Sequence, residues 1–174
     1  KNDYILVSDP NDWLKWDDNV NGTIIGGVML TWQSAVRFDP SDLSSYGNSQ
    51  ITMVRVYVGD LPAAATIKIW QGTNQLNLVE YVSQGFSPTA NSWNIITLNQ
   101  PYTVIASEEL WFGVEWDNPA VDVFPAGADA LTSQTGKSDL YRTDITDPNA
   151  WGTLSSLSIN RDWNHQAYIV QTGS

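Results

Sequence analysis

The sequence predicts an all-β protein, a jelly-roll β-sandwich of two antiparallel sheets with one short helical turn. Two observations support this fold class. Segments rich in β-branched and aromatic residues recur along the chain, and Gly, Pro, Asn and Asp clusters separate them at short, regular intervals. The predicted strands cover residues 31–38, 51–58, 66–71, 76–82, 92–98, 109–117 and 166–171.

Two further stretches complete the predicted layout of one domain over residues 1–174. Residues 39–47 begin with Asp39-Pro40 and end with Gly47, a pattern typical of one or two helical turns. Residues 117–151 are rich in Ala, Gly, Asp, Thr and Pro, so we expect long loops around one short strand near residues 121–124. Because the first and last segments of sandwiches often pair, we expect both to belong to the sheets.

Composition and charge exclude several classes of function. Nineteen acidic residues against eight basic ones give a net charge of -11, which repels nucleic acids and anionic lipids. No apolar run approaches the roughly 18 residues that a membrane helix needs. The chain has no cysteine, which excludes disulfides and thiolate sites. It starts at Lys1 without a signal peptide, so we expect a mature or excised piece of a longer, secreted or cell-surface protein.

Nine tryptophans point to binding through aromatic faces, and Trp70 gives the clearest signal. Ile67 and Ile69 share one face of their strand, so the two-residue period places Trp70 and Lys68 on the opposite face. An outward indole is a flat surface on which a sugar ring can stack. The alternative is that such tryptophans pack beneath the long loops of residues 117–151.

The same period places other candidate ligand-binding residues on outward faces. Trp111 and Glu115 lie opposite the apolar residues of segment 109–117, and Trp93 lies opposite those of segment 92–98. Arg55 and Tyr57 lie opposite three valines. If these strands share a sheet, the side chains form one aromatic and polar platform. Four other tryptophans lie in or near predicted loops, a second place for sugar binding: Trp13, Trp16, Trp151 and Trp163.

Residues 17–22 match the opening of a calcium-binding loop. Asp17, Asn19 and Asn21 alternate before Gly22, and calcium prefers several oxygen ligands around such a turn. The twelfth position is Val28 instead of the bidentate Glu of a helix-flanked loop. The alternative is a hairpin, because Asn-Gly favours a type I′ turn. We therefore expect structural calcium or a tight turn here.

The sequence gives little indication of a catalytic site. His165 is the only histidine, and the chain lacks a Gly-x-Ser-x-Gly motif. A glycosidase needs two carboxyl groups about 5–10 Å apart. Glu109 and Glu115 share a strand face, but six strand residues span roughly 20 Å. We therefore expect a protein that is not an enzyme.

Several short segments resemble a jelly-roll domain that recurs in large secreted bacterial adhesins and peptidases, as in the gingipain-type adhesin domains. The resemblance spans most of the chain and implies a β-sandwich in an extracellular multidomain protein, with adhesion or glycan binding as its usual role. The matching segments are WLKWDD at 13–18, AVRF at 35–38 with Asp42, Leu43 and Tyr46, IKIWQG at 67–72, LWFG at 110–113, FPAG at 124–127 and GKSDL at 136–140.

These observations favour a non-catalytic carbohydrate-binding module of a secreted multidomain bacterial protein. Its partner is a polysaccharide or glycan, and other domains of the parent protein are possible further partners. The first alternative is an adhesion or assembly domain that binds protein, which a broad exposed apolar patch would favour. The second alternative is a glycoside hydrolase, which two carboxylates in one cleft would favour.

Overall fold

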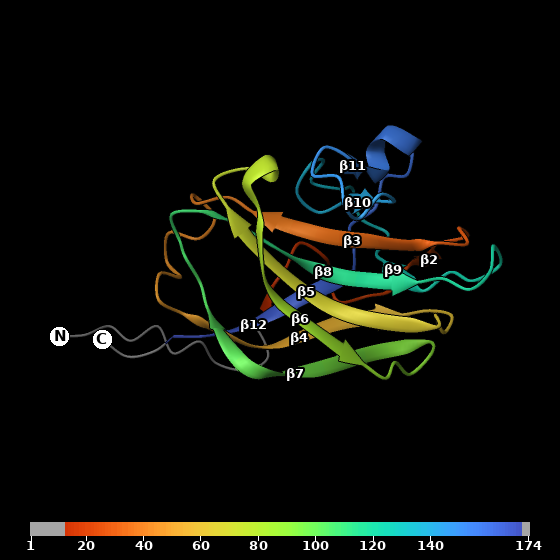
Figure 1. Cartoon of the computed structure of the whole chain (residues 1–174), viewed down its shortest axis with the longest axis horizontal. Helices are drawn as coiled ribbons and strands as arrows, with labels where there is room; N and C mark the ends of the chain where they lie inside the picture. Colours follow the sequence, from red (N-terminus) through yellow and green to blue (C-terminus); the bar gives the residue numbers. More distant parts are fainter. Residues whose placement is uncertain (1–12, 172–174) are drawn as a thin grey trace.

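The computed structural model describes residues 13–171, which form two antiparallel sheets packed face to face (Figure 1). This confirms the predicted all-β sandwich. Sheet A contains β1 (Trp13–Leu14), β2 (Thr23–Ile25), β4 (Gln50–Val58), β7 (Ser92–Thr103), β9 (Ala126–Ala128) and β12 (His165–Val170). Sheet B contains β3 (Thr31–Phe38), β5 (Ala64–Gly72), β6 (Val79–Phe86), β8 (Glu109–Asp117), β10 (Leu140–Arg142) and β11 (Gly152–Thr153).

Most successive long strands cross between the sheets, as is typical of jelly-roll sandwiches, and the hairpin of β5 and β6 is the exception. Sheet B runs in the order β11-β10-β3-β8-β5-β6, and its short strands β10 and β11 lie beyond β3 (Figure 1). In sheet A, β12 lies between β1 and β4, so the first and last described strands pair as expected. Burial of the facing apolar residues drives this packing.

The two-residue alternation decides which side chains enter the core. Val54, Val56 and Val58 of β4 are fully buried, while Arg55 and Tyr57 between them face outward and are only partly buried. The same rule holds in β5, β7 and β8. The core between the sheets includes Val36, Ile51, Val54, Val56, Ile67, Ile69, Phe112, Val114, Trp116, Trp163 and Ile169.

Two local predictions were wrong. Residues 121–124 form a turn, and the strand follows them as β9, whose small residues pair with β2. Gly127 allows β9 to lie close to β4 as well, because a Cβ there would lie 2.6 Å from the Tyr57 Cβ. Residues 39–47 form turns, one of them closed by the helix-type bond from Leu43 N to Asp39 O, in line with the short helical turn predicted there. Two further groups of helical residues were not predicted. These helical residues form the 3-10 turns η1 (Gln75–Asn77) and η2 (Leu154–Leu157). Because η1 occupies the start of the strand predicted from residue 76, the strand β6 begins only at Val79.

Neither of these helical turns is long or apolar enough to cross a membrane, within the part of the chain that the structure describes.

Candidate binding groove

The predicted ligand-binding side chains lie on two opposite outer faces of the sandwich. Trp70, Trp111, Lys68 and Glu115 belong to sheet B, whereas Trp93, Tyr57 and Arg55 belong to sheet A. Each side chain points away from the core, as the alternation predicted. A single platform that joins all of them is therefore wrong, because the sandwich separates the two groups.

On sheet B, Trp70 and Trp111 are neighbours across the β5–β8 ladder, and Trp151 covers them. The Trp151 ring lies 5.6 Å from the Trp70 ring and 5.1 Å from the Trp111 ring, between ring centroids. Only 3% of Trp70 and 1% of Trp111 are exposed. Burial of an indole in this way matches the alternative in which loops cover the outward tryptophans.

A row of polar side chains crosses the same face beside the tryptophans. Arg142 Nε donates to Gln33 Oε1 at 2.7 Å, and Gln33 Nε2 donates to Glu115 Oε2 at 2.7 Å. Glu115 lies 3.8 Å from Lys68 Nζ, which donates to Glu80 Oε1 at 2.8 Å. The row links strands β10, β3, β8, β5 and β6. Lys68 is 8% exposed and depends on these partners, since a buried charge without them is costly.

A groove of about 410 Å³ opens where the tryptophans meet this polar row. Trp70 and Trp151 form its aromatic part, and the Arg142 guanidinium lies 4.7 Å from the Trp151 ring centroid. Glu80, whose side chain is 43% exposed, supplies a carboxylate to the groove. Ligand sites typically combine apolar surface with a few polar groups in such a volume. The remaining polar lining includes Gln75 and Thr146.

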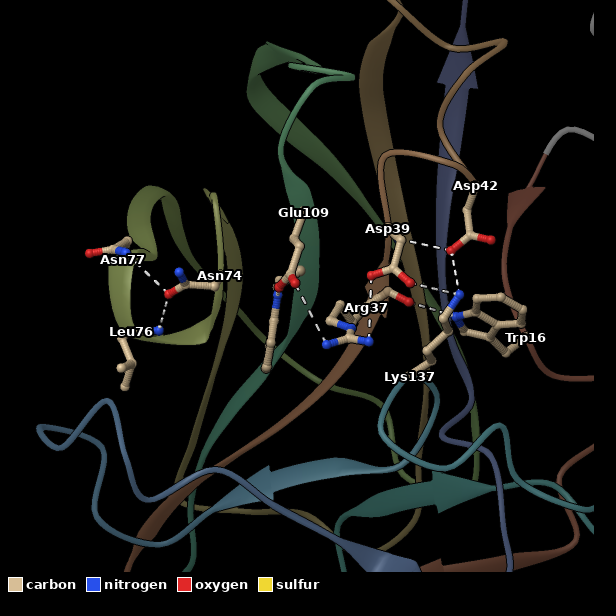
Figure 2. Close-up of polar contacts among 10 residues, drawn as sticks. Trp16, Arg37, Asp39, Asp42, Asn74, Leu76, Asn77, Glu109 and Lys137 are labelled. Carbon is tan, nitrogen blue, oxygen red and sulfur yellow. Dashed lines mark hydrogen bonds and ion pairs between the residues drawn. The ribbon is translucent and has the colours of Figure 1, made fainter.

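One wall of the groove is the 3-10 turn η1. Asn74 caps this turn, because its Oδ1 accepts a hydrogen bond from Leu76 N at 2.9 Å (Figure 2). Gln75 Nε2 donates to Pro148 O at 2.8 Å, which fastens the turn to the loop that leads to Trp151. The turn-forming residues Gly72, Thr73 and Asn74 precede this wall in the sequence, but no local pattern indicates its contact with Pro148.

Charged residues fix Trp111 at the start of β8. Its Nε1 donates to Glu109 Oε2 at 2.8 Å. Figure 2 shows Glu109 beside Arg37, at 3.7 Å, and Arg37 beside Asp39, at 3.4 Å. Lys137 pairs with Asp39 at 3.0 Å. These partly exposed ion pairs are individually weak, but together they hold the carboxylate that orients the indole.

The outer face of sheet A carries a second aromatic cluster. The Arg55 guanidinium lies 4.4 Å from the Trp93 ring centroid and 5.2 Å from that of Trp13. Tyr57 meets Trp93 edge to face at 5.8 Å. Arginine therefore occupies the space between the two indoles, so this face offers a sugar ring less free aromatic surface than the prediction assumed. A second hollow of about 380 Å³ adjoins Trp93.

The predicted calcium loop lies against this same face. Asp17 Oδ1 accepts from Asn19 N and from Gln166 Nε2, and Asn21 Oδ1 accepts from Asn164 Nδ2 at 2.9 Å. The Asn21-Gly22 hairpin alternative is wrong, because the positive φ of 70° falls at Asn19 and the following strand β2 pairs with β9. No three carboxylate or imidazole groups among residues 13–171 are arranged to hold a metal ion, so a site here would depend on amide oxygens as well.

His165 lies inside the sandwich, away from both faces. It is fully buried, its Nε2 lies 2.7 Å from Ser34 Oγ, and its ring stacks on Trp163. Burial lowers its pKa to about 4, which keeps the imidazole neutral. These contacts give His165 a packing role.

Comparisons of the chain with models of protein families, with curated proteins and with solved structures found no match. The geometry of the two faces therefore carries the functional argument. The groove on sheet B combines the larger hollow, aromatic surface and accessible polar groups. The sequence singled out Trp70 as an outward platform and Trp151 as a loop tryptophan, and both line this groove. Glu80 and Arg142, which also line it, were missed, because no local pattern singled them out.

Proposed function

We propose that this chain is a non-catalytic, extracellular glycan-binding module that holds a polysaccharide in the groove on sheet B. The observation that carries the proposal is that Glu80 and Arg142 line one hollow of about 410 Å³ together with Trp70 and Trp151. Neutral sugars need this combination, because their ring carbons are apolar and their hydroxyls are polar. The net charge of -11 also favours neutral over anionic polymers.

Each part of the groove has a role in this proposal. Trp70 and Trp151 form the apolar floor of the groove, against which a sugar ring packs and from which it excludes water. Glu80 accepts hydrogen bonds from hydroxyls, while Arg142 and Gln75 donate to them. The strands fix the floor, and the Gln75–Pro148 bond fixes the rim, so little conformational entropy is lost when a glycan binds.

Glu80→Gln is expected to weaken glycan binding by about ten- to hundredfold, because a hydrogen bond to a charged group contributes about 1.5–3 kcal/mol. A glycan array identifies a ligand for the wild type, and calorimetric titration then measures Kd for the variant. The melting temperature is recorded in parallel, since Glu80 also accepts from Lys68.

The matched control is Asp117→Asn, which makes the same change of charge at an exposed position of the same sheet. Asp117 is the last residue of β8, and Trp111, the neighbour of Trp70 in the groove, lies six residues earlier in the same strand. The control therefore lies roughly 20 Å from the groove. We expect its Kd to equal that of the wild type. Equal binding by Glu80→Gln, or no glycan bound by the wild type, would contradict the proposal.

A second candidate function, contact with a protein, is favoured by one observation at an end of the sandwich. The loop before β3 meets the loop before β9, since Gly27 N donates to Val123 O and Asn118 N donates to Leu30 O. A third loop joins them through the bond from Asp60 N to Phe124 O. Several large apolar side chains are exposed on these loops, as at protein interfaces. They are Met29, Leu30, Leu61, Val121 and Phe124.

A fluorophore can test this end because the chain has no cysteine of its own. Met29→Cys labelled with an environment-sensitive dye is expected to change its emission when a protein covers the exposed apolar residues. The same label at Ser44→Cys is the control, because Ser44 is exposed in the segment that follows the opposite end of β3. An emission change at Met29 alone supports protein contact, whereas a glycan that alters neither label agrees with binding in the groove.

A further inference from the structure

Three loops are joined into one surface at an end of the sandwich: residues 26–30, 59–63 and 117–125. Asp60 Oδ2 accepts a hydrogen bond from Phe124 N at 2.9 Å, and Asn118 Nδ2 donates to Val123 O at 2.9 Å. Gly27 has a positive φ of 79°, and a Cβ there would lie 2.9 Å from the Phe124 ring, so this ring lies directly against the glycine. The surface is therefore fixed before a partner arrives, and binding orders few further groups.

Apolar side chains project from all three loops. Met29 is 67% exposed, Val121 66% and Leu61 52%, and Leu30 and Phe124 are also exposed. We call these five side chains the apolar end. Single exposed apolar residues are common, but a group of them on loops that contact one another is typical of a surface that a partner covers.

The ionisable side chains of the same three loops are all acidic. They are Asp60, Asp117 and Asp122, and the loops contain no Lys, Arg or His. Asp117 and Asp122 are exposed, and none of the three carboxylates forms an ion pair within residues 13–171. Asp60 and Asp122 directly adjoin Leu61 and Val121 in the sequence. The apolar end thus has an acidic rim without internal counterions.

The acidic rim decides which kind of partner fits the apolar end. Surfaces that bind one another carry charges of opposite sign, and like charges brought together disfavour the complex. A second copy of this chain would place the same three carboxylates opposite one another, and its net charge of -11 adds to the repulsion. An anionic bilayer is repelled for the same reason. A protein surface with basic residues around apolar ones matches both the rim and the apolar end.

We propose that the apolar end docks a protein segment whose apolar side chains are flanked by lysine or arginine. This inference rests on protein contact at this end and names the chemistry of the partner, and it is independent of glycan binding in the groove. The apolar side chains of the two proteins exclude water from the centre of the contact. Lysine and arginine suit the edge, because their aliphatic stems pack on apolar surface while their charges pair with the rim.

A dye-labelled, amphipathic synthetic peptide of leucine and lysine is the probe, and fluorescence anisotropy measures its Kd for the whole chain. A peptide with glutamate in place of every lysine has the same leucines and the opposite charge. We expect the lysine peptide to bind and the glutamate peptide not to bind. Raising the ionic strength from about 0.01 M to about 0.1 M shortens the Debye length from about 30 Å to about 10 Å and should weaken binding of the lysine peptide.

Met29→Ser is expected to weaken binding of the lysine peptide by about ten- to hundredfold, because the partner no longer buries the methionine. The matched control is Leu76→Ser, which removes an equally exposed class of side chain from η1, beyond the far end of β5 from residues 59–63. We expect Leu76→Ser to bind the peptide as the wild type does. Met29 is exposed, so the melting temperature of its variant should stay close to that of the wild type.

Asp122→Asn should weaken binding of the lysine peptide by about two- to fivefold, the effect of one exposed ion pair. Ser44→Lys makes the same change of net charge at an exposed site beyond the opposite end of β3 and should leave Kd unchanged. Equal weakening by these two variants would overturn the proposal, because net charge alone would then attract the peptide. Undiminished binding by Met29→Ser would overturn it as well. Equal binding of both peptides, lost in Met29→Ser, would overturn the basic character of the partner and leave protein contact in place.

Discussion

Replacing Gly113 with alanine is expected to lower the free energy of unfolding by at least about 4 kcal/mol, a loss in the range of severe backbone strain. A Cβ at Gly113 would lie 1.9 Å from Ser34 O and 2.8 Å from the Ala35 Cα. Both are backbone atoms of the neighbouring strand β3, so the β3–β8 ladder would have to separate. Ser34 Oγ also accepts from Trp116 Nε1, and that buried bond would shift as well.

Gly85→Ala is the matched control in the same sheet. Its added Cβ would meet no atom closer than Ala65 O at 4.0 Å, so we expect a change within about 1 kcal/mol. Urea unfolding followed by tryptophan fluorescence measures both variants. If the two variants unfold at the same urea concentration, the close approach of β3 and β8 at Gly113 is wrong.

Trp70→Ala is expected to lower the free energy of unfolding by about 3–5 kcal/mol, as for other buried tryptophans. The substitution removes an indole that is 3% exposed and leaves Trp151 without its edge-to-face partner. Removal of an exposed stacking platform would instead affect binding with little change in stability. The stability of this variant, measured by thermal and urea unfolding, therefore separates a buried floor from an open platform.

Leu76→Ala is the control for Trp70. Leu76 lines the same groove but is 58% exposed, so its removal should change stability by less than about 0.5 kcal/mol. A Trp70 variant as stable as the Leu76 variant would show that the indole contributes little to packing.

Strand alternation predicted the directions of the side chains but not what covers them. Trp70 and Trp111 point away from the core, as the two-residue period requires, because that period is a local property of an extended backbone. Their cover is Trp151, a residue about 80 positions from Trp70 in the sequence. Only the pairing of β3 with β10 brings that loop across the face, and a single sequence does not encode such pairing locally.

For the loop of residues 17–22, too, the sequence predicted the local motif but not the distant residues that contact it. Its alternating oxygens identified Asp17 as a metal-ligand candidate. The amide of Gln166 lies on β12 and that of Asn164 directly precedes this strand, so their approach to the loop depends on the β1–β12 and β4–β12 ladders. The short strand β9 was also missed, since Ala and Gly are depleted in strands and form one here only through tertiary packing.

The position of β12 inside sheet A affects when the molecule can fold. Its partners β1 and β4 lie more than 100 residues earlier in the sequence, so sheet A remains open until the last part of the domain has been synthesised. Such non-local pairing carries a large loop-closure entropy and places folding in the millisecond-to-second range. During that interval the edge of β4 that β12 will occupy is free to pair with other chains. Because β12 lies between β1 and β4, sheet A can complete its folding only after residues 165–170 have been synthesised. Until then, aggregation competes with folding.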